Sequence, residues 1–131
     1  MKFLKIAIVA LLMPVIFFSC KKDKVDTVQP VEGNWVGLYG FGNDAPSISY
    51  KLNIKHDGII EELNVSGQSK GDGPWSFNGN TLTAHYQWKP PMNTIFSISA
   101  TYDPSTKKLT GTWGYDNSTT NGGKWESTKS N

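Results

Sequence analysis

ISYKLNIK, residues 48–55, alternates apolar and polar side chains at every position. Successive side chains of a β-strand point to opposite faces, so this alternation predicts a strand with one buried face and one face in water. Residues 81–88, 96–102 and 108–115 repeat the pattern. The chain after residue 31 is therefore predicted to form half-buried strands, and it contains no stretch with the apolar spacing of a helix.

Turn signals separate these runs at short intervals. Asp57-Gly58 and Asn78-Gly79-Asn80 are typical of tight hairpins, because glycine accepts a positive φ. Asp103–Thr106 is typical of a type I turn with proline at its second position. Gly71–Pro74 and Asn121–Gly123 indicate looser breaks between strands.

The runs and turns together predict eight strands, at about residues 34–40, 47–55, 59–65, 74–78, 80–88, 94–102, 107–115 and 123–128. Short connections between consecutive strands favour an all-β fold, a single antiparallel up-and-down barrel of about eight strands. Such a barrel is wide enough for side chains or for one small ligand. A two-sheet β-sandwich is the alternative architecture.

The N-terminus has the composition of an export signal. Lys2 and Lys5 precede an apolar run at residues 6–18, and its 13 residues are fewer than the roughly 20 that a membrane-spanning helix needs. The run leads to Phe17–Cys20, which holds the single cysteine of the chain. This stretch resembles the lipobox of bacterial lipoproteins, because a small residue, Ser19, precedes the cysteine. Phe17 and Phe18 stand where leucine and a small residue are usual, so the stretch is similar to the looser lipoboxes of the Bacteroidota.

The lipobox resemblance implies that residues 1–19 are a signal peptide and that Cys20 carries a lipid. Residues 20–31 then form a flexible tether, and residues 32–131 form one domain. The expected location is the cell envelope, with the outer membrane as a partner through the lipid. A plain signal peptide with an incidental cysteine is the alternative. Lys21–Lys24 weakly resembles the export signals of surface-exposed lipoproteins, and a solvated linker is its alternative.

Charge argues against a nucleic-acid partner. The chain has 13 lysines, no arginine and 11 acidic residues. Removal of residues 1–19 leaves 11 lysines against 11 acidic residues. Nucleic-acid binders carry a clustered basic patch, and no such cluster follows residue 31.

Three motifs resemble the calycin barrels, which include the lipocalins. Gly33-Asn34-Trp35 is similar to the start of lipocalins, residues 75–83 to the central hairpin of small bacterial lipocalin-like domains, and residues 108–113 to a late strand. The resemblance implies a barrel that holds a small ligand. No C-terminal helix of the lipocalin kind is predicted, and residues 41–46 are too few for the helical lid of fatty-acid-binding proteins.

Few groups could carry out catalysis. His56 adjoins a predicted hairpin tip and His85 lies on the polar face of its strand, whereas a metal site needs three or four converging ligands. Glu61 and Glu62 are adjacent, so they face opposite sides of a strand and cannot act as paired carboxylates. The glycine-rich residues 37–42 precede no predicted helix, which phosphate loops require. We therefore expect no enzymatic activity, no metal and no cofactor.

Glu61 shares a predicted strand face with Ile59, Leu63 and Val65. If that face points inward, Glu61 is a polar group inside the barrel and a handle for a ligand, and it needs a partner because an unpaired buried charge is costly. A position near the barrel mouth, in water, is the alternative.

Aromatic residues are the strongest functional hint, because 13 of the 16 in the chain follow residue 31. Ligand pockets are mostly apolar, and Trp and Tyr add polar tips to such surfaces. The candidate ligand-binding residues are Tyr50, Trp75, Tyr86, Trp88, Trp113 and Trp125. A core filled by these side chains, with no open pocket, is the alternative.

Two functions fit these observations. The first is a lipid-anchored, non-enzymatic envelope protein that binds a small apolar or aromatic ligand in its barrel. The second is an interaction or inhibitor module with a filled barrel, whose loops contact a protein or a glycan. Trp88–Asn93 joins two strands and places Trp88 and Met92 at an expected exposed tip, which would serve either function.

Overall fold

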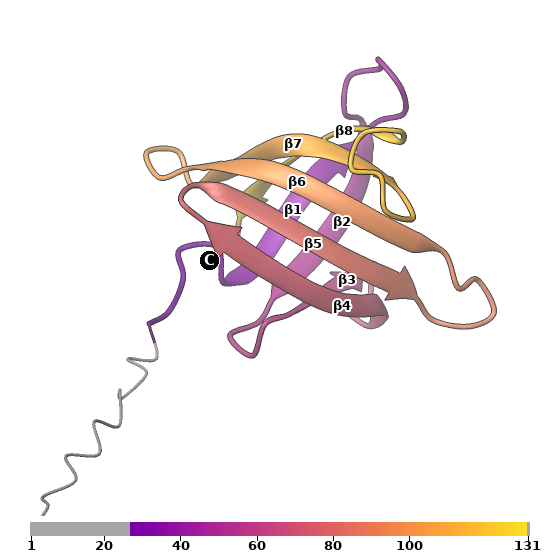
Figure 1. The fold of residues 1–131 in the computed structure, drawn as a ribbon, viewed down its shortest axis with the longest axis horizontal. Helices are drawn as coiled ribbons and strands as arrows, with labels where there is room; N and C mark the ends of the chain where they lie inside the picture. The colour runs from indigo at the N-terminus through magenta and orange to yellow at the C-terminus, as the bar shows by residue number, and fades with distance from the viewer. Residues whose placement is uncertain (1–26, 131) are drawn as a thin grey trace, which may run out of the picture.

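The computed structural model describes residues 27–130, which form eight antiparallel strands closed into one barrel (Figure 1). The strands are β1 (Gly33–Tyr39), β2 (Ile48–Ile54), β3 (Ile59–Leu63), β4 (Ser69–Asn78), β5 (Thr81–Trp88), β6 (Ile95–Asp103), β7 (Lys108–Tyr115) and β8 (Gly123–Lys129). Each strand pairs with its neighbours in sequence, and β1 also pairs with β8. The predicted up-and-down barrel is confirmed, and the sandwich alternative is wrong.

The fourth strand differs from its prediction. β4 begins at Ser69, so Gly71–Pro74 lies within a strand and is not a break. A Cβ at Gly71 or Gly73 would collide with carbonyl oxygens of β5. Glycine inside a strand marks such a close approach of two backbones. Glycine at these two positions therefore lets the β4 backbone lie close to β5. On its other side, β4 pairs with β3, and the register of that pair shifts between Glu62 and Leu63.

One end of the barrel is closed by a solid core. Trp35 from β1, Ile60 from β3 and Leu109 from β7 are fully buried there. The described chain enters at this end, in indigo in Figure 1. Val31 is also fully buried, and its carbonyl accepts a hydrogen bond of 2.7 Å from the Trp35 indole. The core therefore includes Val31, one residue before the expected start of the domain.

Small residues occupy inward positions at mid-height. Ala100 pairs with Gly111 across β6 and β7, and Ala84 and Gly37 face inward on β5 and β1. A side chain at Gly111 would collide with a backbone oxygen of β6. These positions leave the barrel interior unfilled between its closed end and the opposite end.

The export signal of residues 1–19 and the lipidation of Cys20 lie outside the described residues. No helix within residues 27–130 is long and apolar enough to cross a membrane.

Candidate ligand cavity

A cavity of about 240 Å³ occupies the half of the barrel opposite the closed end. It lies towards the β1–β2, β3–β4, β5–β6 and β7–β8 connections. Its lining consists of Tyr39, Phe41, Tyr50, Leu52, Glu62, Tyr86, Trp88, Thr94, Phe96, Ile98, Trp113, Tyr115 and Trp125. Nine of these residues are aromatic, so the cavity presents mainly ring faces and ring edges to anything inside it.

Edge-to-face ring contacts hold the aromatic wall in place. The Trp113 ring lies 5.7 Å from Tyr39, 5.4 Å from Phe41 and 5.2 Å from Tyr115, measured between ring centroids. Such pairs are favourable beyond their burial. The Trp113 indole also donates a 3.0 Å hydrogen bond to the Gly40 carbonyl. The wall is therefore shaped by the protein before any ligand enters.

Glu62 is the single carboxylate in the cavity lining. It is 7% exposed, and its Oε2 accepts hydrogen bonds from both Tyr86 Oη at 3.0 Å and Trp88 Nε1 at 2.8 Å. Lys70 Nζ lies 2.8 Å from the other carboxylate oxygen and 4.0 Å from the Trp88 ring centroid. A buried charge persists when it is paired and hydrogen-bonded, and Glu62 satisfies both conditions.

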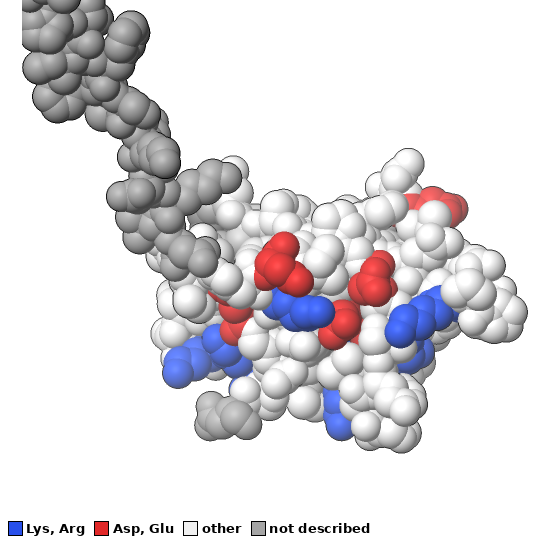
Figure 2. Space-filling view, turned by 90° about the horizontal axis from the view of Figure 1, so that it is seen from below, with Lys and Arg blue, Asp and Glu red and all other residues white. Residues whose placement is uncertain are grey.

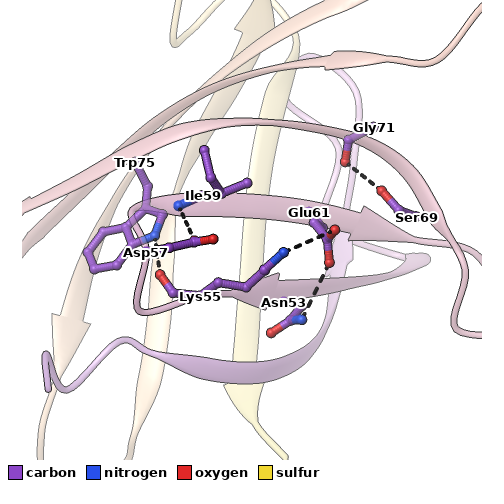
Figure 3. A network of polar contacts seen from close by, with 8 residues as sticks. All are labelled: Asn53, Lys55, Asp57, Ile59, Glu61, Ser69, Gly71 and Trp75. Atoms are coloured by element: carbon purple, nitrogen blue, oxygen red, sulfur yellow. Dashed lines mark hydrogen bonds and ion pairs between the residues drawn. The ribbon is translucent and has the colours of Figure 1, made fainter.

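The inward carboxylate is Glu62. Of the two interpretations left open for Glu61, the one that places it inside the barrel is wrong. Glu61 points outward, where its carboxylate lies 3.5 Å from Lys55 Nζ and accepts a 3.5 Å hydrogen bond from Asn53 (Figure 3). Ile60 is the fully buried residue of this strand. Ile59 and Leu63, which share the outward face with Glu61, are half-buried, and Val65, which belongs to the same sequence pattern, is 94% exposed in the loop after β3.

Two tyrosine hydroxyls in the cavity stay protonated at neutral pH. Burial raises the pKa of Tyr50 well above its ordinary value; the Ser127 hydroxyl offsets part of this rise, and the charge of Glu62 adds to it. Burial and the nearby Glu62 charge likewise raise the pKa of Tyr86. Burial and a neighbouring negative charge both disfavour the phenolate, so each hydroxyl keeps its proton.

Tyr50 Oη and Ser127 Oγ are buried and have no hydrogen-bond partner among the described residues. Both residues pair with Gly37, Tyr50 from β2 and Ser127 from β8. The two hydroxyls lie close enough to interact, but their geometry falls short of a hydrogen bond. Only Tyr50 lines the cavity.

Five of the six candidate residues come together around this cavity: Tyr50, Tyr86, Trp88, Trp113 and Trp125. Trp75 does not line it. Its indole donates a 2.8 Å hydrogen bond to the Lys55 carbonyl, next to the β2–β3 hairpin (Figure 3). Trp88, the last residue of β5, lines the cavity and is not at an exposed tip, whereas Met92 in the connection that follows is exposed. The sequence reasoning missed Tyr39, Phe96 and Glu62; the alternation on 94–102 already placed Phe96 on an inward face.

The remaining polar groups form local pairs. His85 Nδ1 lies 2.8 Å from the Ser97 hydroxyl, and His56 contacts the buried Glu32 carboxylate. Within residues 27–130, no three His, Cys, Asp or Glu side chains gather as a metal site would require. Basic and acidic side chains alternate on the face in Figure 2, so this face presents no patch of one sign.

Comparison of the chain with protein-family models, curated proteins and solved structures gives no significant match.

Proposed function

We propose that this chain is a lipid-anchored protein of the bacterial cell envelope whose lipocalin-like barrel binds a small apolar or aromatic ligand without chemical conversion. The observation that carries the ligand proposal is the preformed aromatic cavity of about 240 Å³. The observation that carries the anchor is the lipobox-like Phe17–Cys20 after an apolar run.

The cavity volume limits the size of the ligand. Engineered apolar cavities of about 150 Å³ accept benzene, and pockets for drug-sized ligands begin at about 300 Å³. A cavity of about 240 Å³ lies between these values. A compound with one or two rings fits, whereas a long acyl chain would extend out of the mouth.

The arrangement of polar groups favours binding over catalysis. General-base catalysis needs a group that can reach a proton of the substrate. Tyr86, Trp88 and Lys70 already donate to the Glu62 carboxylate. This carboxylate orients the cavity wall, and no second carboxylate lies beside it in the cavity lining.

The described chain enters the domain at the end opposite the cavity. The described chain enters at the closed end, where Val31 packs against Trp35. A lipid on Cys20 would connect to the domain at its closed end, so the tether itself would not cover the cavity mouth.

Ligand binding can be tested with short fatty acids, aromatic acids, neutral one- and two-ring aromatics and short sugars, read by calorimetry and melting. A cavity ligand at a hundredfold excess over Kd should stabilise the fold by about 2.7 kcal/mol. Ile98 lines the cavity, so Ile98→Trp should abolish that gain. Ser99 faces outward, so Ser99→Trp is the matched control and should retain it. No effect of any compound at millimolar concentration would reject the ligand proposal.

A protein or glycan partner is the second candidate, and one observation favours it. Phe41, Val65 and Met92 are exposed apolar residues in three loops at the cavity end of the barrel. Exposed apolar side chains around a mouth can contact a partner. If this candidate is correct, Val65→Ser with Met92→Ser should weaken partner binding, and Ile98→Trp should leave it unchanged.

A further inference from the structure

The outer surface of the barrel carries a groove of about 340 Å³ across β4, β5 and β6. Its polar lining consists of Ser76, Thr83, His85, Ser97, Asn117 and Thr119. The four of these that lie on strands occupy positions between inward residues, so their side chains point away from the aromatic cavity. Among the described residues that line the groove, none is a lysine, an aspartate or a glutamate.

The β7–β8 connection forms one wall of the groove. Ser97 on β6 pairs with Gly114 on β7, and the connection lies directly on both. The Ser97 hydroxyl donates to the Asp116 carbonyl, and a Cβ at Gly114 would collide with the Ser118 carbonyl oxygen. Ser97 is only 5% exposed as a result. The wall is therefore held in place without a ligand, and the groove opens beside it over β4 and β5.

The hydrogen bond between Ser97 and His85 fixes the position of the proton on the imidazole. His85 Nδ1 lies 2.8 Å from Ser97 Oγ. The one hydroxyl proton of Ser97 is directed at the Asp116 carbonyl, so Nδ1 must donate to Ser97. Nε2 of the neutral, exposed imidazole is then an acceptor, and it bonds to no described residue. Because the imidazole cannot take the Ser97 proton in this arrangement, the pair is suited to recognition and not to nucleophilic catalysis.

The other polar groups of the groove are hydroxyls and an amide. Ser76 Oγ and Thr83 Oγ1 lie 2.8 Å apart, and their shared hydrogen bond uses only one of the two hydroxyl protons. Asn117 and Thr119 add an amide and a hydroxyl from the wall. Pro74 is exposed and also lines the groove, so an apolar ring borders these groups. The groove thus offers uncharged donors, uncharged acceptors and one small apolar surface.

These groups match an uncharged ligand with many hydroxyls. A charged ligand would lose water and find no opposite charge on the lining side chains, which is costly. An apolar ligand would leave the hydroxyls, the amide and the imidazole without partners. A sugar donates and accepts through each hydroxyl, and its C–H groups can contact the ring of Pro74. Pockets for drug-sized ligands begin at about 300 Å³, so the groove has room for one or two sugar rings.

We propose that this outer groove binds one or two rings of an uncharged carbohydrate. One sugar hydroxyl donates to His85 Nε2, and others bond to Thr83 and to the β7–β8 connection. The inference goes beyond the ligand of the cavity, because the groove lies on the other side of the sheet. It is therefore tested separately from the cavity.

Matched disaccharides test the class of ligand. Maltose, lactose, cellobiose and N,N′-diacetylchitobiose are uncharged, cellobiouronate is an anion and the deacetylated chitosan dimer is a cation. Affinities are measured by NMR titration of the full chain in one polyoxyethylene detergent, because detergents with a sugar head group would compete. We expect the best uncharged sugar to bind more tightly than either ion by a factor of about three or more. A smaller margin, or no binding of any sugar at high millimolar concentration, would overturn the proposal.

Thr83→Val removes one groove hydroxyl and keeps a branched side chain of the same size. It should weaken the best sugar about three- to tenfold, the effect of one hydrogen bond. Thr81 lies on the same outer face of β5 and does not line the groove, so Thr81→Val is the matched control and should change the affinity less than about twofold. Both threonines are exposed, so both variants should fold. Equal effects of the two changes, or no effect of Thr83→Val, would show that the sugar does not bind in the groove.

The imidazole nitrogens give a measurement that needs no variant. The chain has two histidines, His85 in the groove and His56 in the β2–β3 connection at the closed end, which serves as an internal reference. At about pH 8, where free imidazole is neutral, a bound sugar should move the ¹⁵N resonance of His85 Nε2, because that nitrogen accepts a new hydrogen bond. His85 Nδ1 and both nitrogens of His56 should move much less. An unmoved Nε2 resonance on sugar binding, or an equal shift at His56, would contradict the proposal.

Discussion

Replacement of Glu62 by methionine tests whether this carboxylate organises the cavity wall. Methionine has a similar length and no acceptor. The change leaves the Tyr86 hydroxyl and the Trp88 indole without the acceptor that they share at 3.0 and 2.8 Å. A buried donor without an acceptor costs about 1–3 kcal/mol. Two such donors, one of them half-buried, lower the free energy of unfolding, and the apolar burial of methionine offsets part of this loss. The expected net loss of unfolding free energy is about 2–4 kcal/mol.

The adjacent Glu61→Met is the matched control. Glu61 faces outward, and its side chain is 22% exposed beside a Lys55 that is 39% exposed. Exposed pairs of this kind contribute about 0–1 kcal/mol. Urea unfolding of both variants measures the difference in their free energies of unfolding. The melting temperature should fall by roughly 10–25 °C for Glu62→Met only. Equal losses for the two variants would refute the assignment of the inward carboxylate.

A double-mutant cycle with Tyr86→Phe separates the hydrogen bond from general disruption. In the unmodified chain, Tyr86→Phe should cost about 1 kcal/mol. In the Glu62→Met background it should cost nothing or stabilise the fold, because it removes a hydroxyl that has lost its acceptor. The expected coupling is about 1–2 kcal/mol. If Tyr86→Phe costs the same in both backgrounds, the 3.0 Å contact carries no energy and the reasoning is wrong.

Further outcomes follow from burial and charge. Trp113→Ala should cost roughly 3–5 kcal/mol in urea unfolding and the outward Thr112→Ala less than about 1; comparable losses would mean the face is misassigned. Residues 27–131, expressed in a reducing cytoplasm, should give a β-rich circular dichroism spectrum and a cooperative melt, which a helical spectrum would contradict. Stability should fall as pH rises above about 10, because the raised pKa of Tyr86 keeps it protonated in the folded state while the unfolded chain ionises; Tyr86→Phe should make this fall shallower. Cys20→Ser should release the protein from the membrane fraction, and full retention with processing after residue 19 would reject lipidation.

The strands were predictable wherever one face is buried and the other is in water. β5 alternates throughout in burial and residues 96–102 of β6 alternate in sequence, so the sequence placed their inward residues correctly, Tyr86 and Phe96 among them. Glycine misled the prediction in β4, since Gly71 and Gly73 can mark a turn or a close approach of two strands. Only the position of the β5 backbone distinguishes these cases, and that position depends on residues distant in sequence.

The inward carboxylate was beyond local reasoning for a similar cause. Glu61 and Glu62 have identical chemistry, and alternation alone allows either to point inward. The choice depends on Tyr86 and Trp88, which lie 24 and 26 residues away and supply the donors for Glu62.

Whether the barrel is filled or hollow depends on pairing that composition does not reveal. Ala100 and Gly111 become neighbours through the β6–β7 register, and Gly37 lies between Tyr50 and Ser127 through the pairing of β1 with β2 and β8. Large rings such as Trp113 then stand nearer the mouth, where they contact one another instead of filling the space beside the small residues. The same register brings the hydroxyls of Tyr50 and Ser127 together from the two strands that flank Gly37, so the hollow and this buried pair of hydroxyls have one structural origin.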